Sequence, residues 1–221
     1  MLAVLTGIVA VVHYNQAIPE AISTPTPATP SPTIISPSPS STPTPSPISQ
    51  LQEPILQAPI DQFFERIKYK KFGTSITPAT SPIQPEKFTG YHTGVDVEYT
   101  DVTIDVPVRA AASGIVRQAG FVSGYGGVLV LQHTAKDGSP FYTLYGHLRI
   151  SSLPPVGTQI TTNQQVGLLG TGYSTETDGE RRHLHFALIM SSTIDVRGYV
   201  QNTEELNKIW ADPLLHIADA P

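Results

Sequence analysis

The chain of 221 residues contains no cysteine, which limits the kinds of site it can form. Without thiols there is no disulfide scaffold, no thiolate metal site and no cysteine nucleophile. Any bound metal ion must therefore be held by histidine and carboxylate side chains.

Lysine and arginine are absent from the first 60 residues, which hold 12 of the 21 prolines. The only acidic residues there are Glu20 and Glu53, so the rest of the chain carries 13 basic and 16 acidic residues. A mildly acidic domain lacks the basic surface of a nucleic-acid binder, and we expect no nucleic-acid partner. The change in composition separates an N-terminal region from a single globular domain of about 160 residues.

Residues 1–17 begin with the apolar stretch MLAVLTGIVAVV, which is shorter than the about 20 residues that span a bilayer as a helix. They also lack the positively charged start and the small-residue cleavage site of a secretory signal. We interpret 1–17 as a truncated signal-anchor or transmembrane-like segment, and a buried element of the domain as the less favoured alternative. The preferred interpretation predicts a membrane-tethered, extracytoplasmic protein of the cell envelope.

Residues 18–60 are rich in proline, serine and threonine, as in the run SPSPSSTPTPSP. Proline fixes φ and has no N–H to donate, so this composition disfavours helices and sheets and favours extended polyproline II. The segment also has too little apolar surface to offset the entropy of ordering. We expect a disordered linker that holds the domain away from a membrane.

Residues 61–221 have the pattern of a mainly β domain. Short runs of β-branched and aromatic residues, bounded by glycine or proline, predict strands. These runs are Val106–Ala112, Gly114–Phe121, Val128–His133, Phe141–Leu148, Gln165–Leu169 and Leu184–Met190. One helix is expected near the C-terminus, capped by Thr203 and ended by Asp212-Pro213. The predicted fold is a compact antiparallel β sandwich or small barrel with one short C-terminal helix.

Three local patterns place histidines where they can carry chemistry. His92 and Asp96 are separated by three residues, and Gly94 between them allows the bend that brings both to one ion. His183 and His185 lie at i and i+2, so both face the same side of a strand.

The third pattern is His147, at the end of a predicted strand. Taken together, three segments supply four histidines and one aspartate to a cysteine-free domain. Three protein ligands with one open position are typical of catalytic zinc, and this favours a catalytic zinc site over a structural one.

These segments resemble the lysostaphin/LytM-type zinc endopeptidases. The resemblance covers roughly 72–190, most of the domain, with the matching motifs in the family's order. They are Gly90-Tyr91-His92-Thr93-Gly94-Val95-Asp96, Val108–Val116, Tyr145-Gly146-His147-Leu148, Pro155–Gly170 and His183-Leu184-His185-Phe186. The resemblance implies Zn²⁺ ligands His92, Asp96 and His185, and catalytic residues His147 and His183 beside the reacting water and the scissile carbonyl.

The family's members usually cut peptidoglycan stem or cross-bridge peptides, so the resemblance implies a zinc endopeptidase acting on those peptides. Either His147 or His183 is expected to accept a proton while the other stabilises the oxyanion. Glu180 is a possible alternative base, although a solvated loop charge is its simpler interpretation.

Three departures from the family pattern concern substrate preference. Residues 171–182 are longer than the usual connection and are expected to form a wall of the substrate groove. Asn163 stands where glycine is common, and Ala187 where an acidic residue is often found. His133 and His216 are interpreted as structural.

Two other functions remain open from the sequence. One is a non-catalytic peptidoglycan-binding or hydrolase-activating module, which a missing ligand would have favoured. The other is a secreted protease that acts on proteins.

Overall fold

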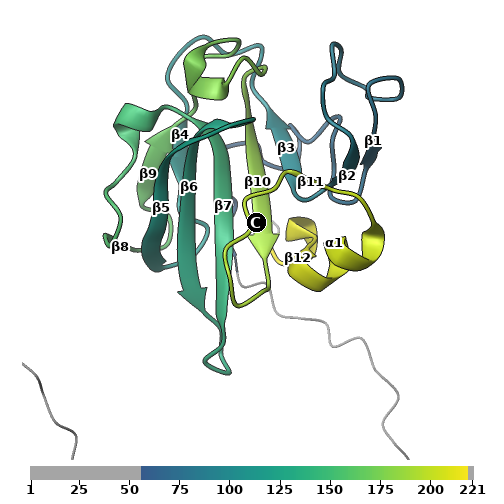
Figure 1. Cartoon of the computed structure of the whole chain (residues 1–221). Helices are drawn as coiled ribbons and strands as arrows, with labels where there is room; N and C mark the ends of the chain where they lie inside the picture. Colours follow the sequence, from purple (N-terminus) through teal and green to yellow (C-terminus); the bar gives the residue numbers. More distant parts are fainter. Residues whose placement is uncertain (1–55, 219–221) are drawn as a thin grey trace, which may run out of the picture. The chain divides into compact units, whose positions relative to one another are not determined.

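A computed structural model describes residues 56–218 and contains a central antiparallel sheet of seven strands (Figure 1). These strands are β3 (Val95–Glu98), β5 (Gly114–Val122), β6 (Gly126–Thr134), β7 (Pro140–Leu148), β8 (Gln159–Ile160), β10 (His183–Ile189) and β12 (Trp210–Ala211). Their order is β12-β10-β7-β6-β5-β8. The strand β3 pairs with the first half of β10, on the same edge that β12 occupies at its end.

Smaller elements surround this sheet. One small sheet contains β1 (Ser75–Ile76), β2 (Gly90–His92) and β11 (Tyr199–Val200), and another contains β4 (Pro107–Arg109) and β9 (Gln165–Leu168). The helical elements are α1 (Thr203–Ile209) and the 3-10 turns η1 (Ile150–Ser152), η2 (Thr175–Thr177) and η3 (Pro213–Leu215).

Both faces of the central sheet are buried. Because the side chains of a strand alternate between these faces, one strand contributes to two separate clusters of core residues. Leu184 and Phe186 of β10 pack into one cluster with Leu129 and Leu131 of β6. Ala187 and Ile189 of β10 instead join a second cluster that includes Val128, Val130 and Trp210. His183 and His185 have the same parity as Ala187, so the sequence pattern places them on the second face, toward β2 and β11.

The expected fold class is confirmed: the domain is mainly antiparallel β with one short helix near the C-terminus. The expected strands are present with shifts of a few residues at their ends, and β4 is only three residues long. The helix is capped by Asn202, not by Thr203, because the Asn202 side chain accepts a hydrogen bond from the Glu205 amide. Asn163 has a φ of 64°, in the left-handed region that asparagine tolerates.

Residues 56–60, which the composition assigned to the linker, pack against the domain. Leu56 and Ile60 are 1% and 2% exposed, and Leu56 forms an isolated bridge with Ile217. The expected anchor at 1–17 and the rest of the linker lie outside the described residues. Within 56–218, no helix has the length and apolar character needed to cross a membrane.

His133 is buried in the domain core, away from the histidines that were predicted to form the site. Its Nδ1 lies 2.8 Å from the Ser113 carbonyl oxygen and its Nε2 lies 2.7 Å from Thr143 Oγ1. Burial lowers the pKa of His133 below its usual value, although the Ser113 carbonyl opposes the shift. The structural interpretation of His133 is consistent with these contacts.

We expect the metal-free chain to lose stability as the pH falls below about 6.5, the unfolded pKa of histidine. Below that pH the unfolded chain takes up a proton at His133 that the folded chain does not, so protonation favours unfolding. Urea unfolding between pH 7.5 and 5 measures this, and His133→Gln should reduce the pH dependence. An unchanged dependence in that variant would contradict the assignment to His133.

Candidate metal centre

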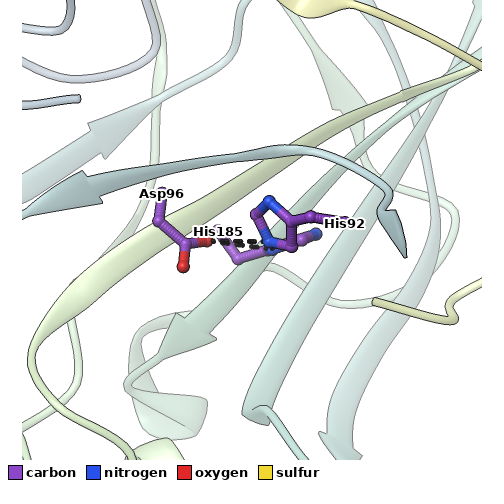
Figure 2. Close-up of side chains that lie close together, drawn as sticks. All are labelled: His92, Asp96 and His185. Carbon is purple, nitrogen blue, oxygen red and sulfur yellow. Dashed lines mark hydrogen bonds and ion pairs between the residues drawn. The ribbon is translucent and has the colours of Figure 1, made fainter. Parts of the chain in front are cut away.

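The pairing of β3 with β10 brings two of the predicted ligands together. Asp96 lies directly opposite His185 in the antiparallel register, and His92 ends β2 just before the chain bends into β3. Figure 2 shows the three side chains converging on one point. All three residues are at most 3% exposed.

The three donor atoms form a nearly equilateral triangle. His92 Nε2 lies 3.1 Å from His185 Nδ1 and 3.2 Å from Asp96 Oδ1, and His185 Nδ1 lies 3.2 Å from the same oxygen. Zinc bonds of about 2.0–2.2 Å in a tetrahedron place the donors about 3.3–3.6 Å apart, so a movement of a few tenths of an ångström would suffice. The spacing therefore fits one tetrahedral zinc ion, with three protein ligands and a fourth position for a reactant.

Hydrogen bonds orient the two ligand imidazoles. His92 Nδ1 lies 3.3 Å from the Lys71 carbonyl oxygen, so this nitrogen donates and Nε2 keeps its lone pair. His185 Nε2 lies 3.3 Å from the Tyr125 hydroxyl, which leaves His185 Nδ1 for the ion. Partners of this kind fix the tautomer and the ring orientation of metal ligands.

Gly94 allows β3 and β10 to approach closely beside the site. A Cβ atom at this position would lie 2.4 Å from the Phe186 carbonyl oxygen and 3.0 Å from His185 Nε2. The sequence predicted that Gly94 permits a bend. The close approach to β10 is a second, stronger requirement for glycine, because any side chain would push the ligand strands apart.

A β-bulge aims His147 at the site. Val128 pairs with Gly146 and Gly127 pairs with Leu148, so His147 is an extra residue on β7, with a φ of 63°. Simple alternation would place His147 on the face of Tyr145, in the core. The bulge turns it to the other face instead, where its ring centroid lies 4.1 Å from that of His183.

The two predicted catalytic histidines thus lie side by side next to the ligands. His183 Nδ1 donates to the Arg181 carbonyl oxygen at 2.9 Å, and its Nε2 lies 3.4 Å from Asp96 Oδ2. His147 Nδ1 is buried and has no hydrogen-bond partner within residues 56–218. The backbone of Thr177 beside this imidazole acts to raise its pKa, and His147 itself lines the pocket described below.

Burial sets the protonation states of the site. It lowers the pKa of His147 to about 3 and also lowers the pKa values of His183 and His185. Burial alone would raise the pKa of Asp96, but the neighbouring His183, His92 and His185 bring it well below its usual value. Neutral imidazoles and an ionised carboxylate are the forms that bind a metal ion.

A pocket of about 370 Å³ opens over the cluster. The 171–182 segment contributes Glu180 and Arg181 to its wall, as expected from the sequence. Glu180 forms an ion pair with Lys87 at 3.0 Å, which agrees with a loop charge more than with a base. Tyr125 lines the pocket, whereas Tyr145 is fully buried in the core and does not.

Several pocket residues were not identified from the sequence. Tyr199 pairs with His92 across β11 and β2, and its hydroxyl accepts a hydrogen bond from Lys70 at 2.9 Å. Lys70 is 2% exposed and pairs with Glu86, so a buried ion pair supports this wall. Arg181 contacts Asp96 directly.

Comparison with known families identifies the domain. Residues 90–196, which include the three predicted ligands and the two predicted catalytic histidines, match the model of peptidase family M23. This part of the chain belongs to that family. The resemblance to lysostaphin/LytM-type peptidases is thereby confirmed, and the M23 domain carries the His-Asp-His cluster expected of a metallopeptidase.

Three solved structures illustrate the similarity of the fold. The lysostaphin catalytic domain from Staphylococcus simulans is 24% identical, with a TM-score of 0.44, covering 66% of this chain and 90% of that one. Helicobacter pylori Csd3 is 22% identical, with a TM-score of 0.48 and coverage of 76% and 36%. A zinc-containing peptidase from Vibrio cholerae is 22% identical, with a TM-score of 0.42 and coverage of 76% and 41%.

This M23 chain therefore spans less than half the length of the last two proteins. No curated protein matches the chain.

Gly94→Ala should destabilise the domain by about 1–3 kcal/mol and weaken metal binding, because the new methyl group overlaps the backbone of β10. Urea unfolding and a zinc titration measure the two effects. Gly167→Ala is the matched control, since a Cβ there meets the Leu153 side chain at 3.3 Å and no backbone atom within reach. Equal effects of the two substitutions would contradict the role of Gly94.

Proposed function

We propose that this M23 domain is a zinc-dependent endopeptidase that hydrolyses peptide bonds in peptidoglycan stem or cross-bridge peptides. The observation that carries the proposal is the triangle of His92 Nε2, Asp96 Oδ1 and His185 Nδ1, with sides of 3.1–3.2 Å beneath an open pocket. A closed structural site would need a fourth protein ligand. Within residues 56–218, the cluster that fits one ion contains only these three.

His92, Asp96 and His185 would hold the ion, and Tyr125 and the Lys71 carbonyl would keep the two imidazoles in place. When bound, zinc supplies a Lewis acid that polarises a carbonyl group and lowers the pKa of water. The rest of the chemistry belongs to the side chains that face the pocket.

His147 and His183 are the groups that exchange protons with the reactants. Both are neutral and adjacent, so one accepts a proton from the attacking water while the other donates a hydrogen bond to the developing oxyanion. His147 lines the pocket, which favours it for direct contact with a reactant. His183 Nδ1 is already used by the Arg181 carbonyl, which leaves only Nε2 for that contact.

Peptidoglycan as the substrate rests on the family, whose members usually act on wall peptides. It agrees with the composition of residues 1–60, from which we infer an extracytoplasmic, membrane-tethered protein. A proline-rich spacer would give the domain reach into the wall while keeping it near the membrane.

Zinc content of the purified full chain, together with digestion of purified peptidoglycan before and after chelation, tests the proposal. The expected result is one zinc per chain and release of peptides that stops on chelation and returns with added zinc. Stoichiometric zinc without any cleavage would instead favour the non-catalytic, hydrolase-activating module. Cleavage of glycine-rich proteins but not of peptidoglycan would favour the secreted protease.

Two substitutions separate metal binding from catalysis. His185→Ala should abolish both bound zinc and activity, because two remaining ligands do not hold the ion. His147→Ala should keep zinc but lower kcat by about 10²–10⁴-fold, the usual contribution of a proton-transfer group. His216→Gln is the control, since His216 lies near the C-terminus, outside the pocket. Full turnover in His147→Ala would overturn its assignment.

A further inference from the structure

Next to the predicted metal ligands, Arg181 forms ion pairs with two carboxylates, those of Asp96 and Glu98. Its Nη2 donates to Asp96 Oδ2 at 2.8 Å and to Glu98 Oε1 at 2.6 Å, and its Nε donates to Glu98 Oε2 at 2.9 Å. All three side chains are at most 4% exposed. Asp96 and Glu98 are two residues apart on β3, so one guanidinium spans both carboxylates on the same face of the strand.

The two carboxylate oxygens of Asp96 therefore have different partners. Its Oδ1 faces His92 and His185 at 3.2 Å, at the corner of the ligand triangle. Its Oδ2 faces away from that triangle, toward Arg181 and His183. A carboxylate whose second oxygen is bound in this way offers a metal ion one oxygen in a fixed direction.

We propose that Arg181, itself held by Glu98, is a positioning residue that fixes Asp96 as a one-oxygen ligand. The inference rests on the zinc site proposed above and adds residues to it that lie outside the ligand set. It also gives Glu98 a role. An arginine beside a metal cation is repelled by it, and the Glu98 carboxylate balances that charge while it orients the guanidinium.

The stability of the fold alone does not explain why Arg181, Glu98 and Asp96 are buried together. Replacing a buried ion pair by apolar residues of similar size is often neutral or stabilising, because the desolvation of the charges is avoided. A purely structural role therefore predicts that apolar replacement of both Glu98 and Arg181 is harmless to the metal site. A positioning role predicts that zinc affinity falls even when the fold is kept, typically by about 10–100-fold for such partners.

Zinc affinity of the full chain, measured by competition with a chromophoric chelator, tests the inference. The variants are Arg181→Met and the double variant Glu98→Leu with Arg181→Met. In the double variant, Asp96 is the one member of the cluster that keeps its charge. We expect about 10–100-fold weaker zinc binding in both, and an altered visible absorption spectrum of the cobalt-substituted protein. Circular dichroism verifies that the β fold is retained.

Arg182→Lys is the matched control. Arg182 is the next residue along the chain, but its guanidinium donates to the backbone carbonyls of Val102 and Ile104, not to Asp96. Its zinc affinity should stay within about twofold of the original chain. If Arg181→Met fails to fold, the double variant carries the test.

The outcomes separate this inference from the proposed function. If the unmodified chain binds no zinc, the metal site itself is wrong. If the unmodified chain binds zinc and the folded double variant binds it equally well with the same cobalt spectrum, Arg181 is only structural and the inference is overturned.

Discussion

The antiparallel register of β3 and β10 places Asp96 opposite His185, and the rest of the site depends on this pairing. Side chains alternate along a strand, so a slip of one residue would turn Asp96 to the other face and separate the ligands. The register is held by apolar residues on the opposite face, where Val95, Val97, Leu184 and Phe186 are fully buried. Burial of the core thus determines the geometry of the polar site.

Burial also determines the chemistry of that site. Three imidazoles are kept neutral by their removal from water, while one carboxylate is kept ionised by the groups around it. Holding these polar groups together without solvent lowers the stability of the folded domain. Binding of a metal ion would stabilise the folded state and offset part of that loss. Lys70, Glu86, Arg181 and Glu98 all lie around this cluster, so the buried ion pairs of residues 56–218 are concentrated at the pocket.

Much of the fold, and the grouping of His92, Asp96 and His185, was predictable from the sequence. The alternation in His183-Leu184-His185-Phe186 gave the two faces of β10 correctly, and glycine at position 94 marked the place where the backbone has to bend or approach another strand. The orientation of His147 was not predictable, because the bulge that turns it arises from the pairing of two distant strands. An isolated histidine on an alternating strand carries no local sign of such a bulge.

Arg181 and Lys70 were not identified for a related reason. A charged residue in a polar segment usually faces solvent, so its sequence context favours an exposed position. Both are buried here because carboxylates from other parts of the chain meet them, Glu98 for Arg181 and Glu86 for Lys70. Pairings over 83 and 16 residues depend on the completed fold, and local patterns cannot indicate them. The helix cap at Asn202 was missed by one residue, although its bond to the Glu205 amide is local.

The most direct test of this account is a crystal structure of the zinc-loaded protein with anomalous diffraction recorded at the zinc absorption edge. The account predicts one anomalous peak about 2.0–2.2 Å from each of His92 Nε2, Asp96 Oδ1 and His185 Nδ1. It also predicts that Asp96 Oδ2 remains on Arg181. A peak bound by His147 or His183, or no peak at the triangle, would contradict it.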